Sequence, residues 1–518
     1  MTGKFFVCVV LCFFALSTKP AVAQIPSNPD SALQSILGAL SGTPLSLQQA
    51  GEYAFDNATS ARKAESAYLA AAGSLRKESG KFDPELFFNL NYVDQEQPSG
   101  SLFSASTTQT ISRSGIRMGL PFGTKLELSL NTVRLITNSQ FAAFSPEYDA
   151  SGTLSIRQPL LGGFMSSGRK QLTKSEEEYD AAKARYDQQI LAVSTDVERA
   201  YWDLYAAERD YAVQKLTRDR AEVFLKETQL RAQTGLIGPN QVASAKTFLA
   251  EQELFLLDRE EQFDRLSDQL ASLIGVRPSG EMTRFLPTDN PRSDIVSDSI
   301  NVLVEQALKN NLDLQAAHHD IESQQSLASA AGWEALPSID LTGSLGGTGL
   351  AGTSRNISFG GFSSPAAPGA TLGDALQQVT KRQFPNWSLG VEVTIPIGFR
   401  SGFGEKDRLD AQVLGAQQRY IEQSRTLEEQ VRSTYRELSN GKNRLKAARE
   451  GVDAAQEQIR IGMIEFYNGR STAFELVRLG EDYAVSQRRY SEALVRTAKA
   501  AATLKQLTSG AYPSASNN

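Results

Sequence analysis

The sequence predicts a mainly helical protein with a smaller β part, in which one structural unit occurs twice. Residues 45–275 and 301–510 each read as an amphipathic helix, short alternating strands and two long helices joined at a glycine. One shift of roughly 234 residues superposes the helical parts of the two copies without a gap. Because most repeat proteins are built from one short unit, a duplication that contains strands and long helices favours a tube. The shift pairs Val197 with Val431, Tyr201 with Tyr435, Gly235 with Gly469 and Leu273 with Leu507.

The first 23 residues are expected to be a secretory signal. An apolar run over residues 5–16 follows a lysine, and residues 21–23 (Ala-Val-Ala) form a small-residue cleavage site. The alternative is a transmembrane anchor, but the run is far shorter than the roughly 20 residues that span a bilayer. Both cysteines, Cys8 and Cys12, lie in this segment. We therefore expect an exported mature protein without a thiol, a disulfide or a lipid anchor.

The regions around the strands and hairpins are less regular. Residues 24–44 are rich in Pro, Ser and Gly and predict a loosely ordered lead-in. An Ala-rich, proline-free stretch predicts one helix over residues 45–79, with a counterpart over 302–333 in the second copy. Residues 276–300 contain three prolines and are expected to link the two copies, and residues 511–518 form a C-terminal tail.

Apolar residues recur with a period of two over about 84–160 and again over about 337–397, which predicts strands. The commoner source of such alternation is a soluble sheet with one buried face. The export signal, the polar loops and the lack of another segment to cover an apolar face favour instead a β-barrel that faces lipid. Segment 345–384, rich in Gly, Ser and Pro, predicts a long surface loop with a short helix over 372–381. The six alternating segments are Leu86–Val93, Ile116–Leu120, Leu126–Asn131, Leu154–Ile156, Ile339–Leu341 and Trp387–Ile395.

Residues 168–234 contain no proline and no internal glycine, and they are rich in strong helix formers. At 1.5 Å per residue they predict roughly 100 Å of helix, which must pack along other long helices. Partner helices are expected over 239–274 and 471–507, so that each copy holds a long hairpin, over about 168–275 and about 402–508. Apolar residues with 4,3 spacing predict a coiled-coil seam. In the first copy the seam consists of Tyr186, Ile190, Val193, Val197, Ala200, Leu204, Ala207 and Tyr211.

Composition and motifs exclude several classes of function. The net charge of −6 on 518 residues is mild and predicts no nucleic-acid partner. No stretch after the signal reaches roughly 18 consecutive apolar residues, which argues against a helical membrane protein. The only histidines, His318 and His319, are adjacent, so on a helix they point about 100° apart and cannot share a metal ion. No nucleophile with a paired base, phosphate loop or zinc spacing occurs. We expect no enzyme activity, no cofactor and no metal site.

Four segments resemble the TolC-like family of outer-membrane efflux and secretion channels. The passages from strand to helix read RQPLLGGF at 157–164 and TIPIGFR at 394–400, and the helix turns read RAQTGLIGPNQVASA at 231–245 and FYNGRSTAFELV at 466–477. The resemblance covers nearly all of the mature chain. It implies a homotrimer in which a β-barrel in the outer membrane, surrounded by lipid, continues into an α-helical coiled-coil barrel in the periplasm. The tip of this barrel stays closed until a periplasmic adaptor (membrane fusion protein) and an inner-membrane pump engage it.

The strand count departs from the family pattern. A few strands cannot close a barrel wide enough for a channel, so several copies must share one sheet. The family pattern is four strands per chain, whereas six segments alternate here, the extra pair lying around residues 116–133. The number of barrel strands per chain stays open.

The resemblance also implies positions for the docking of partners. The tip of the tunnel lies at the two hairpin turns, where adaptor hairpins dock. The alternative reading, in which the turn glycines cap the ends of helices, holds for the same residues. The implied docking residues are Gly235, Leu236, Ile237, Gly469, Arg470 and Ser471.

Family members often carry aspartates just after the second turn, in rings that narrow the tunnel. The matching positions here are Glu475 and Arg478, with Gln241 in the first copy. Three copies of Glu475 around an axis would repel one another and attract cations. Arg478 departs from the acidic pattern, and its i,i+3 spacing allows it to pair with Glu475. Phe466 and Tyr467 flank the same turn, where they either plug the tip or pack inside the helix pair.

Three aspartates recur every seven residues beside the first seam, and they line either the tunnel wall or an ordinary solvated face. They are Asp196, Asp203 and Asp210. The leading hypothesis is a passive trimeric conduit for small toxic solutes or exported proteins. The rival is a periplasmic coiled-coil scaffold or adaptor with a soluble sheet domain, although an adaptor usually has one helical hairpin and this chain has two. The transported cargo and the identity of the pump are not encoded in any motif that we find.

Overall fold

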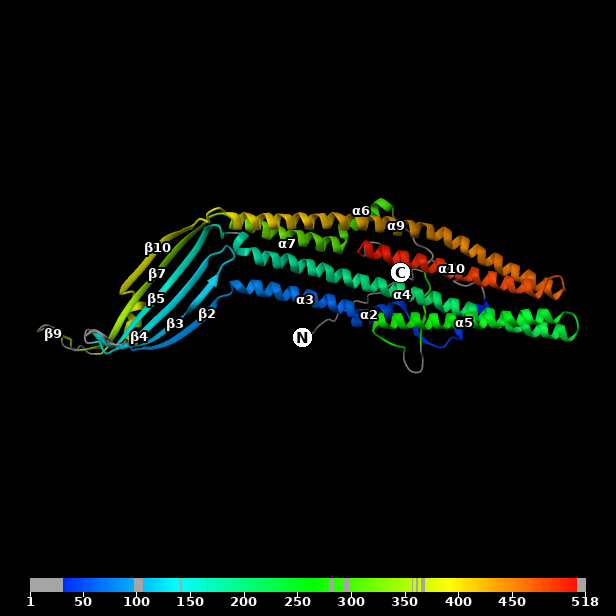
Figure 1. Ribbon diagram of the computed structural model, residues 1–518, viewed down its shortest axis with the longest axis horizontal. Helices are drawn as coiled ribbons and strands as arrows, with labels where there is room; N and C mark the ends of the chain where they lie inside the picture. Colours follow the sequence, from blue (N-terminus) through cyan, green and yellow to red (C-terminus); the bar gives the residue numbers. More distant parts are fainter. Residues whose placement is uncertain are drawn as a thin grey trace, which may run out of the picture.

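The molecule is elongated, with a twisted sheet at one end and long helices that run away from it (Figure 1). The prediction of a mainly helical fold with a smaller sheet is confirmed. The predicted signal, residues 1–23, and the tail, residues 511–518, lie outside the described part of the chain. A computed structural model describes residues 31–96, 106–139, 142–164, 166–278, 284–291, 299–355, 357–359, 362–364 and 369–509.

The described part of the lead-in, residues 31–44, is more ordered than the sequence predicts. Helix α1 spans Ser31–Gly38, and strand β1, Thr43–Leu45, pairs in parallel with β6, Phe285–Pro287, within the predicted linker. Leu33 is fully buried in an apolar cluster that includes Ala212 of a long helix. This burial gives the segment an apolar anchor that the Pro, Ser and Gly content does not reveal.

Two helices stand where the sequence predicts one, in both copies. The first copy has α2, Leu47–Asn57, and α3, Thr59–Ser79, and the second has α6, Ile300–Asn310, and α7, Leu312–Glu334. The residue at each break is extended, with ψ of 120° at Ala58 and 125° at Asn311. The Asn311 side chain accepts a hydrogen bond from the backbone N–H of Leu314 at 3.1 Å, so it caps the start of α7.

Six strands form one antiparallel sheet in the order β10-β7-β5-β4-β3-β2. This number agrees with the six alternating segments of the sequence. The two copies meet where β5 of the first pairs with β7 of the second. The strands are β2, Glu85–Gln95; β3, Thr107–Gly119; β4, Lys125–Thr137; β5, Phe144–Leu161; β7, Ser338–Ser354; and β10, Phe384–Thr394.

The prediction of a long surface loop over 345–384 is wrong in its first part, because β7 continues well into this segment. Short strands β8, Ile357–Phe359, and β9, Phe362–Ser364, follow, and helix α8 spans Leu372–Thr380, where a short helix was predicted. The glycines that suggested a loop instead allow α8 to approach the sheet. A Cβ on Gly349 would lie only 2.1 Å from a backbone oxygen of α8.

The helical hairpins of the two copies match closely. Helices α4, Ser166–Gln233, and α9, Arg400–Tyr467, each contain 68 residues, which corresponds to roughly 100 Å of helix. Their partners are α5, Pro239–Ile274, with 36 residues, and α10, Ala473–Leu507, with 35. Helix α10 begins after the predicted position 471 because the Thr472 side chain accepts a hydrogen bond from a backbone N–H and forms its N-cap.

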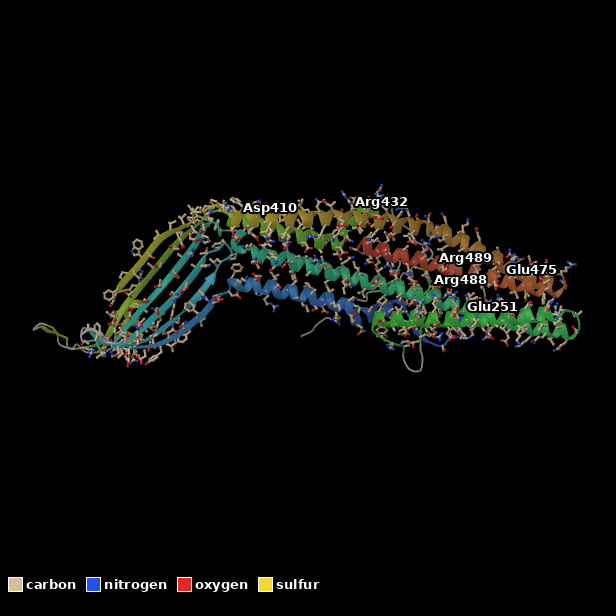
Figure 2. The ribbon with its side chains drawn as sticks, in the orientation of Figure 1. Glu251, Asp410, Arg432, Glu475, Arg488 and Arg489 are labelled. Carbon is tan, nitrogen blue, oxygen red and sulfur yellow. The ribbon has the colours of Figure 1, made fainter. Side chains whose placement is uncertain are left out.

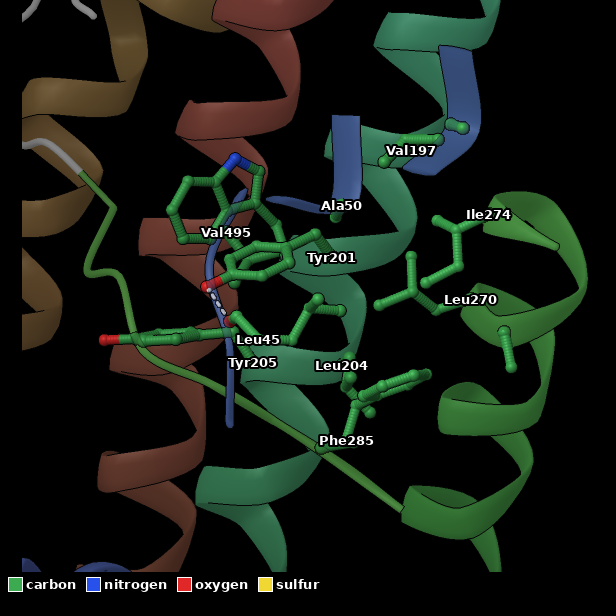
Figure 3. Packing of buried hydrophobic residues seen from close by; sticks show 14 of the residues in the cluster. Leu45, Ala50, Val197, Tyr201, Leu204, Tyr205, Leu270, Ile274, Phe285 and Val495 are labelled. Carbon is green, nitrogen blue, oxygen red and sulfur yellow. Dashed lines mark hydrogen bonds between the residues drawn. The ribbon is translucent and has the colours of Figure 1, made fainter. Parts of the chain in front are cut away.

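The largest apolar core surrounds the middle of α4, where α5, α10 and the β1–β6 pair meet it (Figure 3). Tyr201 is fully buried there, and its hydroxyl lies 3.0 Å from the backbone oxygen of Leu45. The same hydroxyl accepts hydrogen bonds from the backbone N–H groups of Thr288 and Asp289. The buried members of the predicted seam are Val193, Val197, Leu204, Ala207 and Tyr211.

Candidate functional site

One face of the sheet carries an apolar row that crosses all six strands. In the strand register Leu86 lies opposite Ile116, and the row continues from strand to strand until Leu345 lies opposite Trp387. Exposed fractions in this row range from 47% to 83%. Helix α8 covers only a part of this face, around Ala351. The remainder is an apolar surface that no other described helix covers. The row consists of Leu86, Ile116, Leu128, Leu154, Leu345 and Trp387.

The opposite face of the sheet is polar and carries ion pairs. Arg117 lies 2.6 Å from Glu85, and Arg113 lies 2.7 Å from Glu127. Toward the junction of the two copies, Arg157 pairs with Asp340 at 2.6 Å. Exposed pairs of this kind contribute little to stability, about 0–1 kcal/mol each. Together with the apolar row on the other side, these ion pairs give the sheet one apolar face and one charged face.

Both edges of the sheet are open in the described part of the chain, since β2 pairs only with β3 and β10 only with β7. Nearly every residue of these two edge strands is exposed on both faces. Unpaired edges of this length are a template for pairing with another chain. Within the described helices, none combines the length and the apolar character that crossing a bilayer requires.

The two hairpin turns have the same backbone geometry. Gly235 and Gly469 adopt φ of 75° and 70°, and no atom lies within 4 Å of a Cβ built on either of them. In the first turn the N–H of Leu236 donates to the oxygen of Arg231 at 3.0 Å, and in the second the N–H of Arg470 makes the equivalent bond at 2.9 Å. These bonds define a Schellman motif, so the reading of the glycines as helix caps is correct. Their docking role stays a prediction.

The remaining docking candidates are accessible to a partner. Leu236 is 75% exposed, Arg470 is exposed, and Ile237 and Ser471 are half-buried. The turns lie at the end of the molecule farthest from the sheet (Figure 1). A partner could therefore reach both turns without contact with the sheet.

Of the candidates for the constriction, Glu475 lies near the free end of the second hairpin (Figure 2). Its side chain is exposed in the first turn of α10, where the helix dipole favours a negative charge. Arg478 and Gln241 are exposed as well. Among the described residues, no ion pair joins Glu475 to Arg478. The side chain of Tyr467 lies outside the described part.

Phe466 is only 5% exposed and packs between the two hairpins. Its ring centroid lies 5.9 Å from that of Phe224, and the Arg231 guanidinium stands 4.2 Å above the same ring. Arg231 also donates to the backbone oxygen of Phe466 at 3.3 Å. These contacts hold the tip of the second hairpin against the first.

The three aspartates of the first seam occupy different environments. Asp196 is exposed and lies 3.8 Å from Arg199, whereas Asp203 pairs with Lys499 of α10 at 2.7 Å. Asp210 is half-buried, and burial raises its pKa to about 7. Facing cations oppose this effect: Arg259 on α5 and Arg488 on α10 lower the pKa, while Glu492 raises it.

Sequence reasoning missed two buried charges beside Asp210. Glu208 is 5% exposed and Arg209 is 7% exposed. Burial raises the pKa of Glu208 to about 7, against the lowering effect of Arg209, and burial lowers the pKa of Arg209. The Arg209 guanidinium stands 3.7 Å above the Tyr205 ring and donates to Asn290 at 3.2 Å. The run Glu-Arg-Asp reads as a solvated face, whereas in the structure it meets Asn290 and residues of α5 and α10.

A protein-family model matches most of the chain. Residues 121–276 and 303–510 match the model of the outer membrane efflux protein family. These two ranges correspond to the two copies of the duplicated unit. A curated relative is Nodulation protein T of Rhizobium leguminosarum bv. trifolii, 22% identical over 349 residues, which cover 66% of this chain and 68% of the relative.

Solved structures share the fold at low sequence identity. The outer-membrane channel OprN has a TM-score of 0.63 at 15% identity and covers 93% of each chain. The open state of the MtrE outer-membrane channel of Neisseria gonorrhoeae has a TM-score of 0.62 at 16% identity, with 90% of this chain and 89% of that chain covered. The arrangement of a sheet followed by long helical hairpins is therefore shared with known channels.

Proposed function

Because the chain belongs to the outer membrane efflux protein family, whose members are channels of tripartite efflux or secretion systems, we propose that three copies form a passive conduit across the outer membrane. A periplasmic adaptor and an inner-membrane pump supply the cargo and the energy. The observation that carries this proposal is the sheet, which has an apolar face, a charged face and two open edges. No catalytic step is part of the proposal.

Lipid around the closed sheet explains the apolar row. Burial of apolar surface contributes roughly 25 cal/mol per Å², so an uncovered row across six strands is unfavourable in water. Hydrocarbon around this face removes that cost, while the charged face lines an aqueous passage. The ion pairs of Arg113, Arg117 and Arg157 then lie along the inner wall.

The sheet edges support closure between copies. All neighbouring strands are antiparallel and their number is even, so β2 and β10 run in opposite directions. Pairing β10 of one copy with β2 of the next therefore continues the antiparallel pattern. Three such sheets give about 18 strands, a size class that encloses an aqueous channel.

The helices support the same assembly. Helix α9 leaves Phe403, Leu414 and Ile421 between 38% and 57% exposed, and α5 leaves Leu254 and Leu257 more than 60% exposed. Long helices with apolar residues on their outer faces gain stability when a neighbouring copy packs beside them. We propose that these faces meet in the periplasm, with the hairpin turns at the tip and Glu475 near the constriction.

Single-channel recording in a planar bilayer tests this function on the purified mature protein. We expect discrete, small conductance steps that are selective for cations. Glu475→Ala should reduce the cation selectivity or widen the steps, because it removes one negative charge per copy. The matched control is Gln241→Ala, which changes the equivalent position of the first copy without changing charge. A protein that is extracted by salt as a soluble monomer and never conducts would support the rival scaffold.

A further inference from the structure

An imidazole and two carboxylates converge between α4 and α7, far from the hairpin turns. The His319 Nδ1 atom lies 2.8 Å from Glu177 Oε2 and 3.7 Å from Glu322 Oε2. The three ligand atoms all lie within 4.8 Å of one another. Glu177 belongs to α4 of the first copy, whereas the other two residues belong to α7 of the second. The cluster therefore joins the two halves of the duplication.

The charge around this cluster is unbalanced. The neighbours of Glu177 are paired: Glu176 lies 2.9 Å from Arg169, and Glu178 lies 3.2 Å from Lys174. In the part of the chain that the structure describes, the ion-pair partners of Glu177 and Glu322 are imidazoles only, with no Lys or Arg within 4.0 Å. A neutral imidazole nitrogen can donate to one carboxylate and not to both. The two carboxylates thus face only the imidazoles of His318 and His319, with no Lys or Arg to balance both charges.

We propose that Glu177, His319 and Glu322 bind a divalent transition-metal ion of the zinc type, which clamps α4 to α7. The ion neutralises both carboxylates and accepts a lone pair from all three side chains. One nitrogen and two oxygen ligands suit zinc, with a water molecule in the fourth position. The imidazole disfavours magnesium and calcium, which prefer oxygen ligands.

The geometry needs little adjustment to hold the ion. Ligand atoms about 2.1 Å from a tetrahedral zinc ion lie roughly 3.4 Å from one another. The separations of 2.8 and 3.7 Å from the imidazole nitrogen bracket this value. His319 and Glu322 are three residues apart on one helix, so both face the same side. The side chains of Glu177, His319 and Glu322 are 23%, 32% and 43% exposed, so an ion can reach them from solvent.

The adjacent histidine is a matched control. His318 is 60% exposed, and its ring lies at 87° to that of His319. Its Nδ1 atom lies 3.6 Å from the other oxygen of Glu322, Oε1, and it is not one of the three converging groups. If zinc bound any histidine on this surface, loss of either one would weaken binding equally. If the convergence of ligands matters, only His319 is required.

The experiment is a calorimetric titration of the purified mature protein in detergent, stripped with EDTA, with zinc chloride. We expect one zinc ion per chain and a higher melting temperature with zinc than with EDTA. His319→Ala should weaken zinc binding by about 100-fold or more, and His318→Ala should leave it unchanged. Glu177→Gln keeps the side-chain shape and serves as the second variant, with weakened binding expected. Magnesium chloride should not compete.

Any of three results would overturn the proposal. One is a wild-type protein that shows no zinc binding. Another is equal zinc affinity in the His319→Ala and His318→Ala proteins. The third is a His319→Ala protein that loses the same stability in zinc and in EDTA, in which case the cluster is an ion pair and not a metal site. Channel conductance is measured separately, so failure of this proposal leaves the proposed function intact.

Discussion

The two helical hairpins share their length, register and turn geometry, but they differ in what surrounds them. Helix α4 lies in the interior, packed against α1, α2, α3, α5, α7 and α10, whereas α9 packs mainly against α6, α7 and α10 and meets α4 near its tip through Phe466. At equivalent positions Tyr201 is fully buried and Tyr435 only partly. Register and helix propensity thus determine local shape, while the environment of each helix depends on tertiary packing. The exposed side of α9 is the surface that we assign to a neighbouring copy.

The largest difference in stability between the two hairpins is expected when the equivalent tyrosines are replaced by alanine. Tyr201→Ala should cost about 3–5 kcal/mol in the free energy of unfolding, because it leaves a cavity and removes a buried hydroxyl with several hydrogen bonds. Tyr435→Ala should cost about 1–2 kcal/mol, because its side chain is only partly buried. Denaturant unfolding measures both values. Equal losses in the two variants would show that the hairpins are equally central.

The acids Glu208 and Asp210 of α4 should make the stability of the protein depend on pH. Glu208 and Asp210 have a pKa of about 7 in the folded chain, above the ordinary values of 4.5 and 3.8. The folded state therefore holds protons that the unfolded state has already released, and stability falls as pH rises from about 4 to about 7. We expect a loss of about 1–3 kcal/mol, followed by a plateau.

Unfolding curves at several pH values measure this loss. Asp210→Asn and Glu208→Gln should each flatten the pH profile. The equivalent positions in α9 are Lys442, Asn443 and Arg444, which carry no acid, so α9 should contribute none of the effect. A profile that stays unchanged in both variants would locate the titrating groups elsewhere.

Equivalent glycine substitutions in the two hairpin turns should cost the same stability, whereas equivalent substitutions in α4 and α9 should not. Gly235→Ala and Gly469→Ala both force a Cβ into the left-handed region, at a cost of about 1–2 kcal/mol. A new side chain meets no atom within 4 Å in either turn, so packing adds nothing to this cost. Amide hydrogen exchange at the turns and the melting temperature report the effect. Costs that differ clearly between the two turns would show that one of them has contacts in the assembled protein.

The smallest losses of stability are expected from two acids at equivalent positions, one in α4 and one in α9. Asp203 of α4 and Glu437 of α9 both pair with α10, through Lys499 and Arg496. Because these pairs are partly exposed, alanine at either acid should cost no more than about 1 kcal/mol. The loss should shrink at high salt. A larger loss, independent of salt, would mean that the pair is shielded from solvent by another copy.

Much of the fold was predictable because it depends on local pattern. Proline-free stretches and apolar periodicity located α4 and α9, and the glycine turns located their ends. The breaks at Ala58 and Asn311 were missed, although asparagine before a helix is a known capping signal. The glycines of β7 were read as loop residues because their role is to admit α8, which is a tertiary contact.

Candidate sites were likewise predictable where they depend on local sequence and were missed where they depend on contacts between distant residues. The turn glycines follow from backbone geometry, which is local. By contrast, Glu177 and His319 are 142 residues apart, and a search for metal-ligand spacing within one helix could not find them. The burial of Glu208 also depends on helices distant in the sequence. Local patterns therefore predict elements, and distant contacts decide which charged residues leave the solvent.

Disulfide crosslinking between sheet edges tests the central claim, the closure of one sheet by three copies. The mature chain is expected to contain no cysteine, so Asn89→Cys in β2 can be combined in turn with Asn386→Cys or Ser388→Cys in β10, all on the polar face. Within one chain these edges lie about 24 Å apart across the sheet, far beyond the 7 Å limit for a disulfide. The control is Leu389→Cys, on the apolar face.

We predict that at least one polar-face pair gives covalent dimers and trimers and nothing larger, and that the control pair gives none. Oxidised protein that stays monomeric in every pair, while native in its helical content, would contradict the account.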